Sequence, residues 1–203
     1  MIRGVVFDYG GVLARHPRET DFRPIAEEIG LKWEMYLAGV AKYRRAYDGD
    51  LITCAEMYRR VAAENGLVMT EGQLQRLCAA DDGSWIHPIP ETLAWMRELK
   101  AGGYRIGILT NMAEKFFDGP VSAVFAEHIA IADAVVVSGK ENVTKPDAPI
   151  YRLMEKRIGL APDELLFLDD NLCNVEGATA CGWRSAVFSG IADARQVLAE
   201  LLE

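Results

Sequence analysis

Three short apolar runs, each followed at once by polar residues, constrain the fold of this chain more than any other feature. The runs are residues 4–7, 106–109 and 165–168, and they are followed by Asp8, by Thr110 and Asn111, and by Asp169 and Asp170. A short continuous apolar run is typical of a strand buried on both faces of a parallel sheet. Helical patterns separate the runs, and this alternation predicts an α/β fold with a doubly wound, Rossmann-like parallel sheet.

The polar residues at the ends of these runs predict a single site. In an open parallel sheet, ligands bind outside the carboxyl ends of the strands, near the point where the strand order reverses. Each polar motif taken alone is also compatible with a turn, a helix cap or a solvated loop. Their occurrence together, with Lys145-Pro146 between the second and third runs, favours a functional site.

A helical insert follows the first run. Apolar residues recur at helical spacing from Phe22 to Tyr47, and two later segments begin with the capping-box pairs Thr53/Glu56 and Thr70/Gln73. We expect residues 17–85 to form a small all-helical cap domain and residues 1–16 and 86–203 to form the sheet domain. A further strand is predicted at 134–137, and a closing helix at 194–201.

Composition limits the partners of the protein. The chain has 203 residues, of which 50% are hydrophobic, enough for one substantial core and a small accessory unit. The formal charge of -8 argues against nucleic acid or an anionic membrane as a partner. No segment resembles a membrane span or a signal peptide. We expect a cytoplasmic monomer or homodimer with four reduced cysteines, of which Cys173 and Cys181 are expected to be buried.

These motifs together resemble the haloacid dehalogenase (HAD) superfamily of hydrolases, in the form that carries a small helical cap after the first strand. The four family motifs match at residues 7–13, 109–111, 145–147 and 168–178. The Asp-x-Gly-Gly-Val first motif and the Asp-Asp-Asn-x-x-Asn fourth motif are most similar to the sugar-phosphate phosphatases of bacteria and the phosphatase domain of soluble epoxide hydrolase.

The resemblance implies a magnesium-dependent phosphatase that acts on a small phosphorylated metabolite. Asp8 would attack the phosphorus and form an aspartyl-phosphate intermediate. Mg²⁺ would be held by the Asp8 carboxylate, the Gly10 carbonyl and Asp170, with Asp169 acting through a water molecule. Asn174 would orient these ligands.

The resemblance also implies a phosphate site. Thr110 and the backbone amide of Asn111 would bind phosphate oxygens, and Lys145 would neutralise the phosphoryl charge while holding the nucleophile. The backbone of Gly10 and Gly11 would lie against the same phosphate.

Position 10 departs from the family pattern. Family phosphatases usually carry a second aspartate two positions after the nucleophile, where it protonates the leaving oxygen and later activates water, but this chain has Gly10. Positioned proton transfer contributes about 10²- to 10⁴-fold to a rate. A sugar 1-phosphate or an acyl phosphate has a good leaving group and would suit an enzyme without this acid. His16 is a candidate replacement, although a histidine in a loop is more often merely solvated.

Two other functions stay open. The first is 2-haloacid dehalogenation, which uses the same aspartate without a metal, but the Asp169-Asp170 pair favours phosphate chemistry. The second is a non-catalytic binding or regulatory role on this scaffold, because Gly10 removes the expected acid. We expect the cap to set substrate identity, and packing to be the main role of its Tyr36, Tyr43 and Tyr47, which lie beside Arg44 and Arg45.

Overall fold

The computed structural model describes residues 1–202, and its centre is a five-stranded sheet in which every pair of neighbouring strands is parallel. The strands are β1 (Gly4–Phe7), β2 (Arg105–Thr110), β3 (Ala134–Val137), β4 (Leu165–Asp169) and β5 (Arg184–Val187). Their order is β3-β2-β1-β4-β5. The chain therefore builds outward from β1 in one direction and then returns to add β4 and β5 on its other side. The strand order reverses between β1 and β4.

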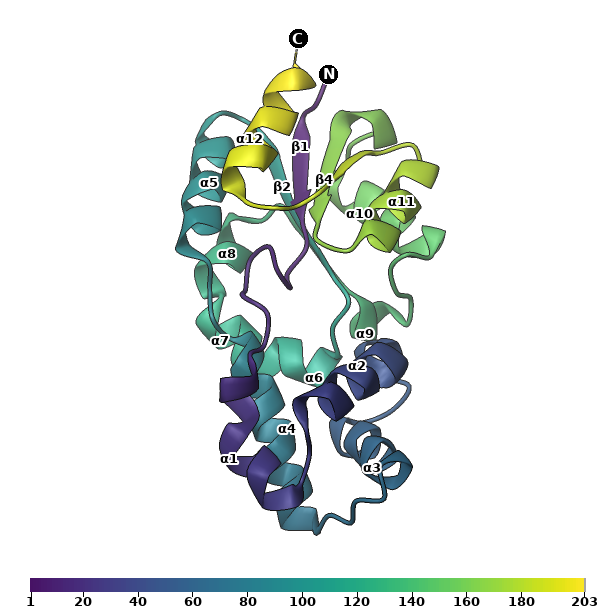
Figure 1. Ribbon diagram of the computed structural model, residues 1–203. Coiled ribbons are helices and arrows are strands. Elements are labelled where there is room, and N and C mark those ends of the chain that lie inside the picture. The colour runs from purple at the N-terminus through teal and green to yellow at the C-terminus, as the bar shows by residue number, and fades with distance from the viewer. Residues whose placement is uncertain (203) are drawn as a thin grey trace.

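Helices cover both faces of the sheet, which makes the central strands fully buried. Val5 and Phe7 belong to one apolar cluster and Val6 to the other, as the alternation of side chains along a strand requires. Figure 1 shows helices on both sides of the sheet. They are α5 (Pro90–Ala101) and α12 (Ile191–Glu200) on one face, and α10 (Ala148–Ile158) and α11 (Leu172–Ala180) on the other.

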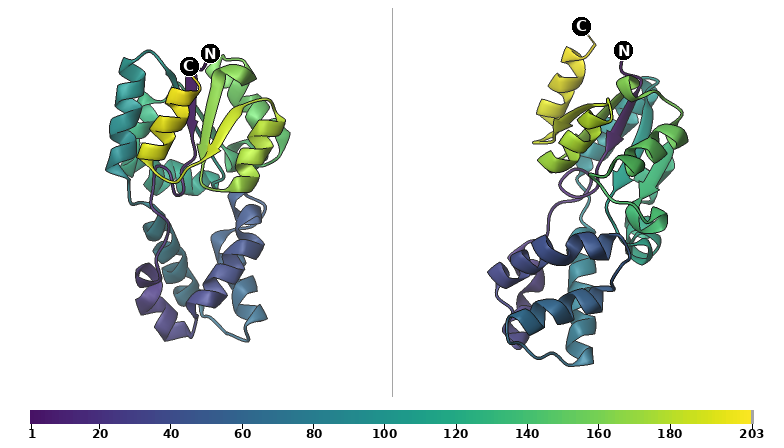
Figure 2. Two further views of the ribbon diagram at one scale, coloured as in Figure 1. Left: turned by 45° about the horizontal axis from the view of Figure 1, so that its top comes forward. Right: turned by 90° about the vertical axis from the view of Figure 1, so that its right-hand side faces the viewer.

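Four helices between β1 and α5 form a separate bundle at the carboxyl end of the sheet, opposite the two chain termini (Figures 1 and 2). They are α1 (Glu19–Ile29), α2 (Trp33–Asp48), α3 (Cys54–Glu64) and α4 (Glu71–Trp85). Helix α1 packs against α4, and α3 packs against both α2 and α4. The Tyr36 ring lies 4.4 Å from the Phe22 ring and 4.7 Å from the Trp33 ring, measured between centroids. Aromatic packing therefore forms much of this bundle's interior.

Short helices complete the sheet unit. The connection from β2 to β3 contains α6 (Glu114–Phe116), the π-helical η1 (Phe117–Val121), α7 (Ser122–Val124) and α8 (Ala126–Ile131). Helix α9 (Ser138–Glu141) follows β3, and the 3-10 turn η2 (Pro162–Glu164) precedes β4.

The end of α2 is bonded to the sheet unit. The Ser138 hydroxyl donates to the Asp48 carbonyl oxygen at 2.6 Å, and the Glu114 amide donates to the Asp50 carboxylate at 2.8 Å. Both acceptors lie at the carboxyl end of α2 or just beyond it. These bonds fix that end of the helical bundle against the loops that follow β2 and β3.

Most of the predicted elements are present. The strands expected at 106–109, 134–137 and 165–168 are confirmed, and α12 is the expected closing helix. Thr70 and Gln73 form a complete capping box. The Thr53 hydroxyl accepts the Glu56 amide at 3.1 Å, but the Glu56 carboxylate pairs with Arg60, so this predicted box is only half formed.

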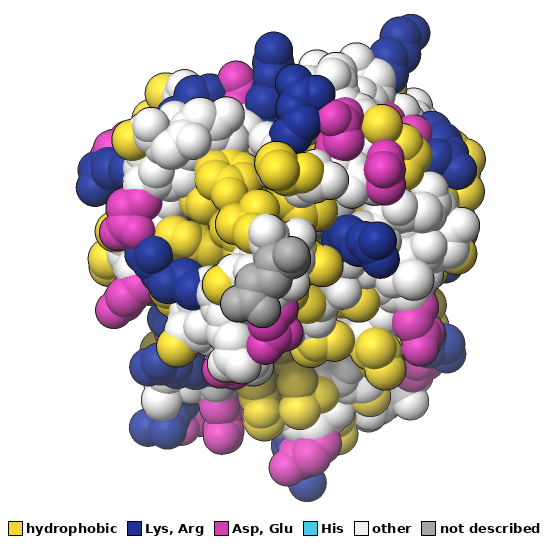
Figure 3. Space-filling model, turned by 90° about the horizontal axis from the view of Figure 1, so that it is seen from above, with side chains coloured by type: hydrophobic (Ala, Val, Ile, Leu, Met, Phe, Trp, Pro, Cys, Tyr) yellow, Lys and Arg dark blue, Asp and Glu magenta, His cyan; other side chains and the backbone are white. Residues whose placement is uncertain are grey.

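Among residues 1–202, no helix is long and apolar enough to span a membrane. The face remote from the helical bundle carries an apolar area near its middle, with charged side chains around it (Figure 3).

The four cysteines are free thiols. Cys181 is buried as expected, but Cys173 is exposed, so the expectation of burial was wrong there. Cys173 lies in the first turn of α11, on the side that faces solvent.

Candidate active site

Three strands bring the predicted polar residues to one edge of the sheet. The register pairs Phe7 with Ile108 on one side and with Leu168 on the other. Asp8, the residue after Phe7, therefore lies beside Asp169 at the end of β4. The Asp8 amide donates to the Leu168 carbonyl oxygen at 2.9 Å, which continues the strand pairing up to the site.

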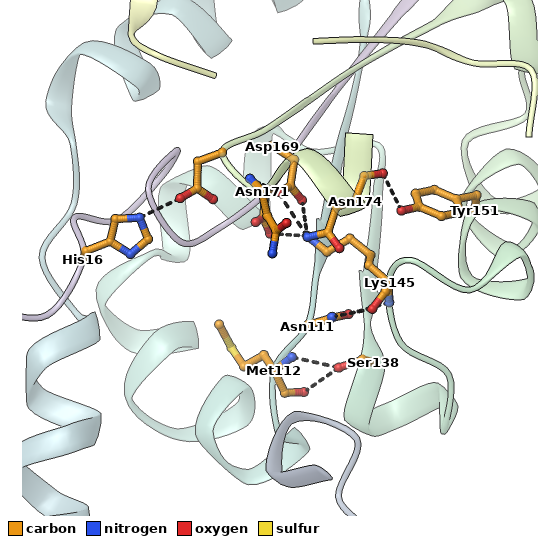
Figure 4. Close-up of polar contacts among 11 residues, drawn as sticks. His16, Asn111, Met112, Ser138, Lys145, Tyr151, Asp169, Asn171 and Asn174 are labelled. Atoms are coloured by element: carbon orange, nitrogen blue, oxygen red, sulfur yellow. Dashed lines mark hydrogen bonds and ion pairs between the residues drawn. The ribbon is translucent and has the colours of Figure 1, made fainter. Parts of the chain in front are cut away.

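Lys145 joins the two carboxylates. Its Nζ lies 2.6 Å from Asp8 Oδ1 and 2.6 Å from Asp169 Oδ2, and only 2% of the residue is exposed. The lysine comes from the loop between α9 and α10. The Asn111 side chain holds that loop, because its Nδ2 donates to the Lys145 carbonyl oxygen at 3.0 Å and its Oδ1 accepts the Lys145 amide at 2.7 Å (Figure 4).

Asp169 is fully buried and bonded through both of its oxygens. The Asn174 Nδ2 donates to Oδ1 at 3.1 Å and to Oδ2 at 3.0 Å, and the Asn171 amide donates to Oδ1 at 2.8 Å. Asn171 also caps α11, since its side chain accepts the Cys173 amide. The start of α11 therefore fixes this carboxylate, and the Tyr151 hydroxyl, which donates to the Asn174 carbonyl oxygen at 2.7 Å, ties α10 to the same helix (Figure 4).

Burial dominates the electrostatics of the site. Desolvation raises the pKa of Asp8 well above its usual value, the charge of Asp169 raises it further, and the Lys145 ammonium lowers it. Asp8, Asp169 and Asp170 each offer an oxygen within 4.8 Å of the other two. Three carboxylates around one ammonium leave an excess of negative charge in a poorly solvated place, which is unfavourable without a further cation.

This donor set fits a divalent metal ion. Mg²⁺ binds oxygen ligands through a few carboxylates and keeps several of its waters. Asp8 is buried while Asp170 is only partly buried, so the carboxylate group faces solvent on one side. A divalent cation would balance the excess charge and favour the ionised form of Asp8.

Asp170 has a different partner from Asp169. The His16 Nε2 lies 2.7 Å from Asp170 Oδ2, and this hydrogen bond raises the pKa of His16 (Figure 4). Gly11 makes the close approach feasible. Its φ is +71°, and a Cβ atom there would stand 2.7 Å from both Asp170 Oδ2 and His16 Nε2.

A cavity of about 250 Å³ opens beside these groups. Its walls include most of the predicted site residues and several others: Asp8, Tyr9, Gly10, His16, Val40, Arg44, Asp48, Trp85, Thr110, Asn111, Met112, Phe116, Lys145, Asp170, Asn171 and Asn174. Asp169 lies behind this wall. Gly11 also lies outside it, and its amide donates to the Ala14 carbonyl oxygen at 2.8 Å. Since that amide is already bonded, Gly11 is not included in the proposed phosphate site.

The helical bundle supplies wall residues that were not predicted as site residues. They are Val40, Arg44 and Asp48 from α2 and Trp85 from the end of α4. The Trp85 ring lies over Gly10, so that a Cβ atom at position 10 would be 3.0 Å from the ring. The Arg44 guanidinium lies between two rings, 5.1 Å from the Tyr47 centroid and 5.0 Å from that of Trp85. Of this group, Arg44 was noted in the sequence beside the cap tyrosines, for which packing was the expected role.

Comparison with protein families matches residues 2–182 to the haloacid dehalogenase-like hydrolases. An (S)-2-haloacid dehalogenase from Pseudomonas fluorescens is 28% identical over 125 residues, which cover 58% of this chain and 50% of that protein, so the match spans only half of its length. A sesquiterpene phosphatase from Aspergillus oryzae is 24% identical over 185 residues, or 89% of this chain and 86% of that protein. The curated relatives are mostly 2-haloacid dehalogenases, with some phosphatases.

Solved structures show the same fold. A HAD family enzyme from Bacteroides thetaiotaomicron has a TM-score of 0.74 at 19% identity, covering 96% of this chain and 98% of its own. The wild-type form of that enzyme, solved in complex with magnesium and inorganic phosphate, has a TM-score of 0.71 at 19% identity, covering 92% and 94%. The family match covers most of the sequence, and the chain belongs to the haloacid dehalogenase-like hydrolases.

Proposed function

We propose that this haloacid dehalogenase-like hydrolase is a magnesium-dependent phosphatase of a small phosphorylated metabolite. The observation that carries the proposal is the group of three carboxylates, Asp8, Asp169 and Asp170, within 4.8 Å of one another. A carboxylate nucleophile suits phosphoryl transfer, and the surplus negative charge suits a divalent cation that also neutralises phosphate.

The chain's own residues account for the main steps. The Asp8 carboxylate attacks phosphorus to form an aspartyl-phosphate and release an alcohol, and water then hydrolyses the intermediate. Lys145 donates to Asp8 Oδ1 and holds that carboxylate in position. The Thr110 hydroxyl and the Asn111 amide, at the end of β2, would bind phosphate oxygens while charge develops on them.

Mg²⁺, held by Asp8, Asp170 and the Gly10 carbonyl with Asp169 behind them, would supply charge neutralisation at the phosphate. Asp169 is held by Lys145 and Asn174. Its fixed charge keeps the lysine ammonium between the two carboxylates.

The cavity limits the substrate. Its volume of about 250 Å³ is below the usual range of about 300–1,000 Å³ for small-molecule sites. A metabolite of the size of a sugar 1-phosphate is the kind of phosphoester that we propose.

Dehalogenation is the second candidate, and the haloacid dehalogenases among the relatives support it. The substrate of this reaction, a 2-haloacid, carries a carboxylate, and a cation in the cavity would have to bind it. Arg44 is the cap cation in the cavity wall, but it donates to Asp48 at 3.0 Å and to Asp81 at 2.9 Å. Because these carboxylates already balance its charge, Arg44 is poorly suited to bind the carboxylate of a 2-haloacid, and the cavity is better suited to a phosphoester whose leaving group is uncharged.

Product assays separate the two reactions. We would measure phosphate release from a panel of sugar phosphates, acyl phosphates and an activated aryl phosphate, with and without Mg²⁺, and halide release from 2-chloropropionate. Asp8→Asn is the blank for both. Magnesium-dependent phosphate release that is lost in this variant is the expected result. Halide release without phosphate release would refute the proposal, and so would the absence of both activities in folded, metal-bound protein.

A further inference from the structure

The proposed reaction lacks an acid at position 10, and the structure points to a replacement on the opposite wall. We propose that Asp48, at the end of the cap helix α2, is the general acid and base of this phosphatase. The assignment rests on the proposed phosphatase function and names the group that exchanges protons with the leaving oxygen and with water.

Asp48 faces the same cavity as the nucleophile. The residue lines this cavity together with Asp8 and Lys145, although it lies on the helical bundle. Its position is fixed by the core: the Ser138 hydroxyl that donates to the Asp48 carbonyl oxygen also accepts the Met112 amide at 2.8 Å. Ser138 and Met112 lie on the side of the site that faces the bundle (Figure 4). Ser138 thereby links the end of α2 to Met112, which lies two residues after the end of β2 at Thr110.

The charges around the Asp48 carboxylate favour its protonated form. Arg44 Nε donates to Asp48 Oδ1 at 3.0 Å, while Arg44 Nη1 donates to both oxygens of Asp81, at 2.9 and 3.3 Å. Two buried carboxylates therefore share one guanidinium, which leaves one negative charge in excess. A proton on one of the two carboxylates removes this excess. Asp81 is almost fully buried and lies outside the described cavity wall, so Asp48 is the member of the pair that can meet a substrate.

The titration of Asp48 agrees with this placement. Burial raises the pKa of Asp48 to about 6. The charges of Arg44 and Lys145 lower this pKa, and the charge of Asp81 raises it. A group that titrates near the working pH is suited to give up a proton in one step and take one in the next.

The other two candidate positions are occupied. At position 10, the ring of Trp85 takes the space into which a longer side chain would extend. His16 reaches the cavity, but its Nε2 is bonded to Asp170 Oδ2. Of the carboxylates that line this cavity, Asp48 is the one that comes from the cap, opposite Asp8.

The proton balance of the two steps is complete. In the first step, the P–O bond to Asp8 forms, the P–O bond to the leaving group breaks, and protonated Asp48 transfers its proton to the leaving alkoxide. In the second step, water attacks phosphorus, its proton passes to the Asp48 carboxylate, and the P–O bond to Asp8 breaks. Asp48 ends each cycle protonated, and the products are the alcohol and inorganic phosphate.

The test is the dependence of kcat/KM on the leaving group, because kcat/KM covers substrate binding and formation of the aspartyl-phosphate but not its hydrolysis. Asp48→Asn keeps the shape of the side chain and can still accept the Arg44 bond, but it cannot act as an acid. With alkyl phosphates, kcat/KM should fall by about 10²- to 10⁴-fold. With p-nitrophenyl phosphate, whose leaving group needs no proton, the fall should be less than about tenfold. Asp48→Glu, which keeps a carboxyl group, should retain the wild-type preference.

Asp81→Asn is a second test, because it removes the other carboxylate from the same guanidinium without changing the cavity wall. Since the charge of Asp81 raises the pKa of Asp48, its loss leaves less of Asp48 protonated, and kcat/KM should fall more for alkyl phosphates than for p-nitrophenyl phosphate. Asp48→Ser provides a second variant without the acid should Asp48→Asn be unfolded, and urea midpoints identify folded variants. Equal losses on both esters in a folded Asp48 variant, or no loss on alkyl phosphates, would overturn the assignment. A folded wild-type protein that hydrolyses neither ester would instead contradict the phosphatase function.

Discussion

Replacement of Lys145 by methionine tests how the site balances its charge. The ammonium lies 2.6 Å from an oxygen of Asp8 and 2.6 Å from an oxygen of Asp169, and the residue is only 2% exposed. Methionine fills a similar volume without the charge, so two buried carboxylates lose their common partner. Removal of one member of a buried ion pair costs about 3–5 kcal/mol. We expect Lys145→Met to lower the free energy of unfolding by this amount at pH 8 in the absence of metal.

The loss should depend on pH, and its sign follows from Asp8. The Asp8 pKa is already raised in the folded protein by burial and by Asp169, and Lys145 lowers it, so the variant should raise it further. A carboxyl group whose folded pKa exceeds the unfolded value, about 3.9, favours folding below that value and loses this contribution as the pH rises through the folded pKa. The deficit of the variant should therefore be smaller at pH 5 than at pH 8.

Urea denaturation in EDTA at the two pH values measures this deficit. Lys140→Met is the control, because Lys140 forms its ion pair with Asp118 at the surface and its loss should cost less than about 1 kcal/mol. Addition of Asp169→Asn to Lys145→Met should recover part of the stability, since it removes one uncompensated charge. A deficit below about 1 kcal/mol, or an equal deficit at pH 5 and pH 8, would refute this account of the site's charge balance.

Three further changes test the packing around the site and the fold. Gly10→Asp places a Cβ atom 3.0 Å from the Trp85 ring, so it should lower phosphatase kcat/KM, and Trp85→Ala should relieve the loss; full activity of the single variant would contradict the crowding. Neither ring nitrogen of His128 has a partner among residues 1–202, and burial lowers its pKa. Its neutral form favours folding above about pH 6.5, and this contribution is lost as the pH falls through the lowered folded pKa, so urea midpoints should drop more from pH 7.5 to 5 in the wild type than in His128→Leu; parallel curves would contradict this. Thr70→Ala removes the acceptor for the Gln73 amide and should cost about 1 kcal/mol in thermal unfolding, whereas an unchanged midpoint would show that the cap contributes nothing.

The core of the fold could be predicted because its strands are short and continuously apolar. Residues 4–7 and 165–168 are buried on both faces, and a strand of this kind is visible in a single sequence. The strand β5 was not predicted. It reads Arg184-Ser185-Ala186-Val187, lies at the edge of the sheet and is only partly buried, so it carries no continuous apolar signal.

The residues at the strand ends could be placed together from the sequence for a similar reason. Parallel strands in one sheet end at one edge, so Asp8, Thr110 and Asp169 had to be neighbours once the strands were identified. Lys145 comes from a loop, and only its motif indicated that it belongs beside them. The ion pairs from Lys145 to Asp8 and Asp169 show that the loop does reach the strand ends.

The cap side of the site could not be predicted, because it depends on how one unit docks on another. Helical spacing shows which face of α2 is apolar, and Tyr36 and Tyr47 are indeed buried. It does not show which residue at the end of the helix meets the core. Asp48 reaches the cavity only because Ser138 and the loops after β2 and β3 receive the end of α2. That contact joins residues ninety positions apart in the sequence.

Because the proposed acid lies on the cap and not in the core, its position depends on whether the cap is docked. A general acid at position 10, close to the nucleophile, would be in place whether the cap is open or closed. Asp48, by contrast, is positioned through the bond between Ser138 and its own carbonyl oxygen, and that bond exists only while α2 is docked. An open cap would admit substrate and water but would leave the aspartyl-phosphate without a base to activate that water. Ser138→Ala should therefore slow turnover of alkyl phosphates more than that of p-nitrophenyl phosphate, in the same direction as Asp48→Asn but to a smaller extent. Equal effects on the two esters would show that docking of α2 does not control the acid.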